Sequence, residues 1–180
     1  MACFVTYWPA DWVKTIIKNG DNGPLSVIYG GEHRSQPPLG KVSIGDVIFP
    51  VTLSGGQLYV LARMTVSSIQ NADEYTEKML KIKRDPFIWD SYTSVHNNSI
   101  AHSIPRTCAD TAAIGTDGTA IALRPVSLEK ITLIKLGPKA GTELPLKMRN
   151  GSISVNNFSG YFRRLSEDSA KLFDHIVHSV

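Results

Sequence analysis

The 180-residue sequence lacks the features that mark membrane proteins and secreted proteins. It contains no run of about 18 apolar residues, the length that a helix needs to cross a bilayer. Its N-terminus has no basic region followed by an apolar stretch, so the sequence predicts no signal peptide. Its two cysteines, Cys3 and Cys108, stand far apart. We therefore expect a cytoplasmic protein without membrane contact, whose cysteines are reduced thiols rather than a disulfide.

Charged residues are also sparse, at 19% of the chain, and the formal net charge is +3. No block of about five or six like charges occurs, so this excess gives little support for an acidic partner. Basic residues gather in two places, which are either solvated faces or contacts for an anion. These are Lys78, Lys81, Lys83 and Arg84 in one cluster, and Arg163 with Arg164 in the other.

The motifs of common enzymes are absent as well. The chain has no Gly-x-Ser-x-Gly elbow, no phosphate-binding glycine loop, no His-Glu-x-x-His and no Cys-x-x-Cys. His96, His102 and Cys108 follow one another at spacings of six residues, which match no common zinc pattern. A nucleophilic Cys108 with His102 as its base would need a lowered cysteine pKa. The sequence therefore favours a binding protein without metal or cofactor. An enzyme with an unfamiliar active site at His102 or Cys108 stays open as a less favoured hypothesis.

The residues that are present are those of a globular domain, with 42% hydrophobic content and a length that fits one domain. Runs of β-branched and aromatic residues, bounded by glycine, proline and asparagine, predict strands. The predicted strands are 3–7, 25–29, 46–51, 58–66, 120–123, 131–136, 144–148 and 159–163, with Gly45-Asp46 as the turn that precedes the third. Capping residues predict three helices, which begin after Asp11, Asn71 and Ser166.

Gly55-Gly56 separates two apolar runs and predicts an antiparallel hairpin between residues 46–51 and 58–66. Pro50 cannot donate a ladder hydrogen bond, so we expect its strand at an edge or a bulge. Strands dominate and helices flank them, which predicts an α+β fold. We expect a small half-open β-barrel of mixed or antiparallel strands with a C-terminal helix. The whole chain, 1–180, is predicted to be one domain, with the barrel core in 1–70 and an extension in 71–180.

Aromatic residues offer candidates for a binding site. Tyr7, Trp8 and Trp12 lie where the first strand meets the first helix, and Trp89 and Tyr92 lie in the irregular middle of the chain. These rings have two interpretations. They pack the core, as most tryptophans do, or they form a stacking wall for a nucleobase or a cation.

Three cations accompany these aromatic residues as candidates for contacts to an anionic backbone. Arg34 lies in the glycine- and proline-rich loop 30–40, Lys41 follows that loop, and Arg63 lies in the second strand of the hairpin. Arginine and lysine at such positions either contact phosphate or are ordinary surface residues.

The N-terminal 70 residues resemble the PUA-like superfamily, in particular its EVE and ASCH branches. The likeness rests on an N-terminal strand, a Gly-Lys step, a hydrophobic-x-Gly-Asp-hydrophobic segment and a strand that ends in valine. The corresponding segments are Phe4-Val5-Thr6, Gly40-Lys41, Ile44-Gly45-Asp46-Val47-Ile48-Phe49 and Ala62-Arg63-Met64-Thr65-Val66. The short ASCH run of glycine, lysine, glutamate and arginine is absent.

This resemblance implies a small barrel that binds RNA or DNA, with a modified base held in an aromatic pocket in EVE-type members. On this chain it extends to the neighbourhood of Trp8 and Trp12, to the loop 30–41 and to the strand of Phe49. The region after Pro105 has no EVE counterpart. Residues 102–110, with Gly118-Thr119 after them, look like those of uncharacterised bacterial proteins, whose families sometimes include small immunity proteins that neutralise a toxin.

Three hypotheses follow from the sequence. In the first, the chain is a PUA-like nucleic-acid-binding module in which Tyr7, Trp8 and Trp12 form the wall of a base pocket. The backbone contacts would then come from Arg34, Lys41 and Arg63. In the second, it is a non-enzymatic immunity protein of a toxin–antitoxin pair, which occludes the active site of a cognate toxin. The third is the enzyme with an unfamiliar site.

Overall fold

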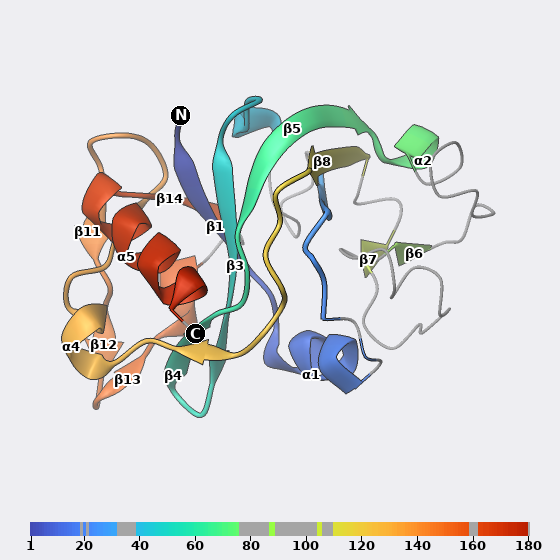
Figure 1. Ribbon diagram of the computed structural model, residues 1–180. Helices are drawn as coiled ribbons and strands as arrows, with labels where there is room; N and C mark the ends of the chain where they lie inside the picture. Colours follow the sequence, from blue (N-terminus) through green and yellow to red (C-terminus); the bar gives the residue numbers. More distant parts are fainter. Residues whose placement is uncertain are drawn as a thin grey trace.

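In the computed structural model, runs of consecutive strands are interrupted by a few helices, which gives an α+β fold (Figure 1). The structure describes residues 1–18, 20, 22–31, 39–75, 87–88, 104–105, 110–158 and 162–179. Several sequence candidates lie outside these ranges. They are Arg34, the cluster from Lys78 to Arg84, Trp89, Tyr92, His96, His102 and Cys108.

Most strands belong to one mixed sheet, in the order β11–β10–β14–β1–β3–β5–β8–β2, with β4 and β9 attached beside β3. The strands are β1 (Cys3–Tyr7), β2 (Val27–Gly30), β3 (Val47–Ser54), β4 (Gln57–Val60), β5 (Met64–Asn71), β8 (Thr111–Gly115), β9 (Arg124–Pro125), β10 (Lys135–Gly137), β11 (Leu144–Pro145) and β14 (Phe162–Leu165). Two small separate sheets contain β6 (Phe87–Ile88) with β7 (Ile104–Pro105), and β12 (Met148–Arg149) with β13 (Ser152–Ile153).

The pairing of β1 with β3 is parallel, whereas the other strand pairs of the described residues are antiparallel. No pairing among the described residues links the two ends of the path, β11 and β2, so the sheet does not close into a barrel. The predicted fold class is therefore confirmed. Strands from both sides of residue 70 share this sheet, because β14 pairs with β1 and β8 pairs with β2 and β5.

The alternation of side chains along β1 explains how both faces of the sheet are covered. Phe4 and Trp8 point into one apolar core, and Val5 between them points into another. Helix α1 (Ala10–Lys18) packs on the first core through Trp12, Val13 and Ile16. The opposite core is covered by α5 (Glu167–His178), as Figure 1 shows.

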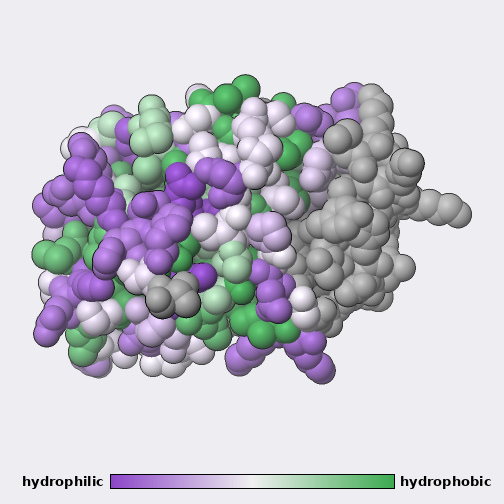
Figure 2. All heavy atoms as spheres, viewed as in Figure 1, coloured by the Kyte–Doolittle hydropathy of each residue, from purple (hydrophilic) through white to green (hydrophobic). Residues whose placement is uncertain are grey.

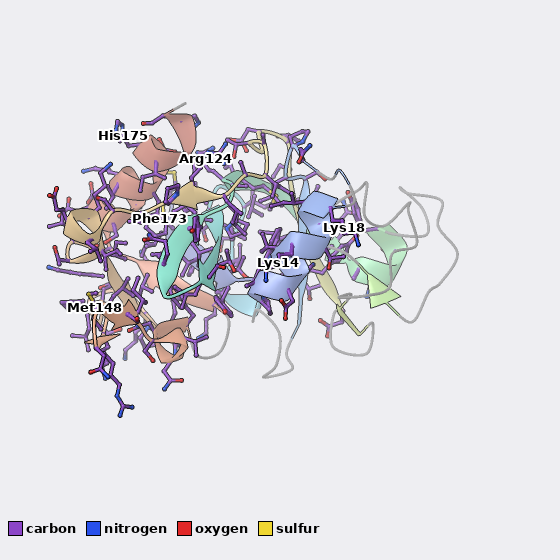
Figure 3. All side chains as sticks on the ribbon, turned by 90° about the horizontal axis from the view of Figure 1, so that it is seen from below. Lys14, Lys18, Arg124, Met148, Phe173 and His175 are labelled. Carbon is purple, nitrogen blue, oxygen red and sulfur yellow. The ribbon has the colours of Figure 1, made fainter. Side chains whose placement is uncertain are left out.

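Helix α5 is anchored by Phe173, which is fully buried and meets the ring of Phe49 edge to face at 5.7 Å. Figure 3 shows Phe173 between the helix and the strands. The cap predicted at Ser166 is present, since its Oγ accepts a hydrogen bond from the Ser169 N–H at 3.4 Å. The shorter helices are α2 (Ala72–Glu74) and α4 (Leu128–Ile131), with 3₁₀ turns η1 (Leu39–Lys41) and η5 (Val155–Phe158).

The predicted hairpin is confirmed, because β3 pairs antiparallel with β4 across Gly55-Gly56, and with β5 beyond it. Both glycines have positive φ, 58° and 78°, as a two-residue hairpin turn requires. The expectation of an edge at Pro50 is wrong, since β3 is an inner strand. The proline lies where the antiparallel partner of β3 changes from β5 to β4, and its carbonyl accepts the Leu61 N–H. The missing proline N–H therefore falls at a break in the ladder.

Four predicted strands differ from the structure. The segment 58–66 is divided between β4 and β5, and the segment 144–148 between β11 and β12. Residues 120–123 are extended but not in a ladder, because Ile121 and Ala122 bond to two different segments, through the carbonyls of Asn22 and Leu61. The segment 131–136 contains the end of α4 before β10 begins. None of the helices in the described ranges is long and apolar enough to cross a membrane.

Candidate functional site

Two of the predicted aromatic residues lie together, and the third lies apart. Trp8 and Trp12 stack with their centroids 5.2 Å apart and their planes at 24°. Trp8 is fully buried and Trp12 is 8% exposed, so both rings belong to the core beneath α1. Tyr7 points to the opposite face of the sheet and stacks on Phe158 at 5.6 Å. The structure therefore does not place the three rings around one pocket.

The core around Trp8 contains buried polar atoms that lack hydrogen-bond partners. Within the described part of the chain these include Nε1 of Trp8 and Trp12 and Oγ1 of Thr6 and Thr52. Thr6 is on the same face of β1 as Trp8, two residues earlier. Thr52 follows Val51, whose carbonyl accepts the Trp8 N–H at 2.9 Å. Such groups are rare in protein interiors, because a buried donor or acceptor without a partner loses its hydrogen bonds to water and forms none within the protein.

The predicted cations occupy separate places. Lys41 is exposed at the end of η1. Arg63 lies between β4 and β5, and its guanidinium forms ion pairs with Asp117 at 2.9 Å and with Asp174 of α5 at 2.8 Å. Arg63 thus joins the sheet to the C-terminal helix and is already engaged by two carboxylates.

Asp117 is held in its ionised form at this junction. Partial burial alone would raise its pKa, but hydrogen bonds from the side-chain hydroxyl and backbone N–H of Thr65 and from Arg63 outweigh that effect. Together they lower the pKa of Asp117 to about 2, from an ordinary value of 3.8. Asp117 is therefore ionised across the neutral pH range.

A second group of cations lines a cleft at the end of the sheet that contains β10 and β11, which we call the basic cleft. Its volume is about 590 Å³, and its walls come from β10, β11, the β12–β13 hairpin, η5 and Arg163 of β14. The cations that line it are Lys147, Arg149 and Arg163, and no carboxylate lies among the described residues of its wall. The structure records no ion pair for Lys147 or Arg149 with any described residue. Because the described wall has three cations and no carboxylate, we expect a positive potential in this cleft.

The β12–β13 hairpin positions two of these cations. Asn150 and Gly151 form its turn with φ values of 51° and 74°, the conformation that Asn-Gly adopts in tight hairpins. Asn157 holds the base of the hairpin: its Oδ1 accepts the Lys147 N–H at 2.7 Å, and its Nδ2 donates to the Lys147 carbonyl at 2.9 Å. Ile153 is buried beneath the hairpin. The backbone around Lys147 and Arg149 is therefore set by local hydrogen bonds.

Apolar side chains accompany the cations. Leu144 and Met148 line the basic cleft and are 65% and 41% exposed. Figures 1 and 3 both place the β12–β13 hairpin, where Met148 is labelled, away from α1 with its exposed Lys14 and Lys18. Figure 2 shows hydrophilic side chains gathered over α5 on the face seen in Figure 1.

The sequence hypotheses missed Lys147 and Arg149, because these residues approach Arg163 only through the pairing of β10 with β14. One local signal was available. Asn150-Gly151 is a strong hairpin indicator, and it stands directly after Lys147-Met148-Arg149.

The structure gives no support to metal or thiol chemistry within the residues that it describes. No group of three or more potential metal ligands occurs among them. Cys3 is a free, half-buried cysteine, and burial raises the pKa of its thiol, although Arg63 and Arg164 act in the opposite direction. Such a thiol is a poor nucleophile at neutral pH. His102 and Cys108, the candidates of the enzyme hypothesis, lie outside the described ranges.

No protein-family model matches the chain, and no curated protein matches it. Two similar solved structures are mutant forms of ZmASCH from Zymomonas mobilis. One has 11% identity and a TM-score of 0.46, and the match covers 97% of this chain and 96% of the other. The second has 13% identity and a TM-score of 0.39, over 74% and 81% of the two chains. These likenesses are distant and assign no family, so function is argued from the residues themselves.

Proposed function

We propose that the chain is a non-enzymatic module that binds single-stranded nucleic acid, and that the basic cleft holds the sugar–phosphate backbone. The observation that carries this proposal is the set of three cations, Lys147, Arg149 and Arg163, in a cleft with no carboxylate among its described residues. Backbone phosphates need cations that are not already neutralised within the protein, and Lys147 and Arg149 meet that condition.

The size and lining of the cleft favour a single strand over a duplex. A volume of about 590 Å³ is typical of sites that enclose a small ligand, so the cleft accommodates roughly one nucleotide at a time. Leu144 and Met148 offer apolar contacts to sugar or base, and Asn156 offers an amide for hydrogen bonds. None of these groups reads a base edge in an obvious way, so we expect weak sequence preference.

The resemblance of residues 1–70 to PUA-like domains supports the same function, since that superfamily implies RNA or DNA binding. Its more specific implication, a modified base in an aromatic pocket at Tyr7, Trp8 and Trp12, stays a prediction. A base could contact Trp8 only if the packing beneath α1 opened, because the ring is fully buried. What supports this part is the pair of indole N–H groups that have no partner among the described residues, which a base carbonyl or ring nitrogen would satisfy.

The alternative, an immunity protein that occludes a toxin, remains a hypothesis without an observation of its own. Cations and exposed apolar residues at one cleft also suit an acidic protein surface. The two alternatives differ in what they predict for isolated oligonucleotides, which only a nucleic-acid-binding module should bind.

The proposal is tested by binding of a fluorescein-labelled single-stranded RNA and its DNA equivalent, followed by fluorescence anisotropy at low salt. A double variant, Lys147→Gln with Arg149→Gln, should bind at least about tenfold more weakly, since each charged hydrogen bond contributes roughly 1.5 kcal/mol or more. The matched control is Lys14→Gln with Lys18→Gln, which removes two exposed lysine charges from α1 (Figure 3).

The control variant should bind within about twofold of the unmodified chain, because it changes the net charge equally but leaves the basic cleft intact. Equal loss of affinity in both double variants would show that only net charge matters and would contradict the assignment of the site. Failure of the unmodified chain to bind either oligonucleotide at low salt would contradict the proposed function and favour the immunity hypothesis.

A further inference from the structure

The β12–β13 hairpin, which brings Lys147 and Arg149 to the basic cleft, is docked on the turn between β3 and β4. The Ile153 N–H donates to the Gly56 carbonyl at 3.5 Å, and the Ile153 side chain is buried beneath the hairpin. Figure 1 shows β13 beside β4, although the two segments are more than ninety residues apart in the sequence. The hairpin is therefore placed relative to the sheet by this contact as well as by its own hydrogen bonds.

Gly56 allows the turn and the hairpin to approach closely. Its φ of 78° favours glycine, and a Cβ at this position would lie 2.9 Å from Oγ and 3.1 Å from Cβ of Ser152. Gly55, its neighbour in the same turn, also has a positive φ, 58°, but a Cβ there would meet no described atom within 4 Å. The two glycines therefore share the turn conformation, and Gly56 is the one that is packed against the hairpin.

This contact reaches the basic cleft through the register of the hairpin. Ser152 is paired with Arg149, and Ile153 is paired with Met148. Arg149 and Met148 both line the cleft. A displacement of Ser152 therefore moves the backbone of Arg149 as well, because the two paired strands are only two residues long and a tight turn joins them.

Asn157 fixes the other end of the hairpin. Its amide takes the place of a neighbouring strand for Lys147, since Oδ1 accepts the backbone N–H at 2.7 Å and Nδ2 donates to the carbonyl at 2.9 Å. Nδ2 also donates to the Ser154 carbonyl at 2.8 Å, so both donors of the amide are in use. The segment that carries the two cations is thus held at its base by Asn157 and near its tip by Gly56.

We propose that Gly56 and Asn157 are positioning residues of the nucleic-acid site, which hold the hairpin so that Lys147 and Arg149 meet phosphates together. This inference rests on the proposed function of the basic cleft. A backbone that is already in place loses less conformational entropy when its side chains bind, so a fixed hairpin gives higher affinity than the same two charges on a loose segment. Both residues act through the hairpin, since neither carries a charge of its own.

The matched pair of variants is Gly56→Asn and Gly55→Asn. Asparagine tolerates positive φ, so the two changes differ mainly in the contact with Ser152. Gly56→Asn should bind the single-stranded oligonucleotide severalfold more weakly by anisotropy. The slope of log K against log salt concentration should also fall by about 0.7–1.4, the contribution of one or two phosphate contacts, without any change in net charge. Gly55→Asn should match the unmodified chain in both respects, and a chain that is merely destabilised would keep its slope.

A second substitution provides the rescue. Ser152→Gly removes both atoms that the new Cβ would meet, so its addition to Gly56→Asn should restore most of the affinity and of the slope. If Gly56→Asn proves unfolded by circular dichroism, Gly56→Ala replaces it, with Gly55→Ala as its control.

Asn157→Ala tests the base of the hairpin and should weaken binding and lower the slope in the same way. Its control is Thr132→Ala, which removes a side-chain hydrogen bond to a backbone carbonyl at an exposed residue that does not line the cleft. Trypsin gives a measurement that needs no ligand. Cleavage after Lys147 and Arg149, followed by the masses of the fragments, should be faster in Gly56→Asn and Asn157→Ala than in their controls.

A variant that matches its control in affinity, slope and trypsin cleavage overturns the positioning role of its residue. Failure of Ser152→Gly to restore binding in the Gly56→Asn chain would overturn the role of the contact between the turn and the hairpin. A different result, failure of the unmodified chain to bind any oligonucleotide, would contradict the proposed function itself and this inference with it. Normal binding by the unmodified chain with unchanged variants would contradict the positioning role alone.

Discussion

Replacing Trp8 separates a core role from a ligand role, because its ring and its N–H group make different contributions. Trp8→Ala removes a fully buried ring that stacks on Trp12 and leaves a large cavity. Such a change costs about 3–5 kcal/mol of the free energy of unfolding. Since small domains have about 5–15 kcal/mol in total, this variant should be close to unfolding.

Trp8→Phe keeps an aromatic face for Trp12 but removes the Nε1–H group, which has no partner among the described residues. A buried donor without a partner costs about 1–3 kcal/mol, so its removal offsets much of the packing lost with the smaller ring. We therefore expect Trp8→Phe to change the free energy of unfolding by no more than about 1–2 kcal/mol.

Both variants are measured by urea unfolding with far-ultraviolet circular dichroism, which does not depend on tryptophan emission. A loss below about 1 kcal/mol for Trp8→Ala would refute the assignment of this ring to a packed core. Oligonucleotide binding is then compared on Trp8→Phe, which stays folded. Unchanged affinity would show that the Trp8 N–H group does not contact the ligand, whereas a loss of about 0.5–1.5 kcal/mol in binding with normal stability, the contribution of one hydrogen bond, would support the predicted base pocket.

Three further predictions concern the scaffold. Asp117→Asn should make the free energy of unfolding less dependent on pH in the acid range. The pKa of Asp117 in the folded chain is about 2, below its ordinary value of 3.8, so the ionised carboxylate stabilises the fold above about pH 4. That contribution is lost as the pH falls toward 2. The carboxylate is 48% exposed, so urea unfolding should register only about 1 kcal/mol for this difference, and equal pH profiles would refute it. Gly118→Ala should lower the free energy of unfolding by about 1–3 kcal/mol or more, since a Cβ there would collide with the Leu25 carbonyl. A normal melting temperature would show that this close contact is absent. Phe173→Ala should lower the free energy of unfolding by about 3–5 kcal/mol, because it removes the buried ring that packs α5 on the sheet, and Phe173→Leu should lower it clearly less. Similar losses in the two variants would contradict the edge-to-face packing on Phe49.

The elements that the sequence predicted correctly have local causes. Ser166 and the apolar stripe after it define α5, and Gly55-Gly56 defines the hairpin of β3 and β4, within short stretches of chain. Strand β8 was missed because Thr111–Gly115 contains two alanines, which have low strand propensity. Ala112 and Ala113 are fully buried between β2 and β5, so the strand forms through distant partners that local pattern cannot indicate.

The candidate site was less predictable than the fold for the same reason. Lys147 and Arg163 are separated along the chain and meet only in the folded sheet, whereas Trp8 and Trp12 drew attention as neighbours and proved to be buried against each other. Arg63 was predicted to contact a nucleic-acid backbone, and this stays a prediction. Its observed ion pairs with Asp117 and Asp174 could not be predicted locally, because Asp174 lies on a helix more than a hundred residues later in the chain.

The central claim, that the basic cleft holds a nucleic-acid backbone, is tested most directly by the salt dependence of oligonucleotide affinity. The slope of log K against log salt concentration, between about 50 and 200 mM, reports the number of phosphates that protein cations neutralise, at roughly 0.7 per contact for a single strand. The Lys147→Gln, Arg149→Gln variant should lower this slope by about 1.4 relative to the unmodified chain, whereas Lys14→Gln, Lys18→Gln should leave it unchanged. An unchanged slope in the cleft variant, or the same reduction in both, would contradict the account.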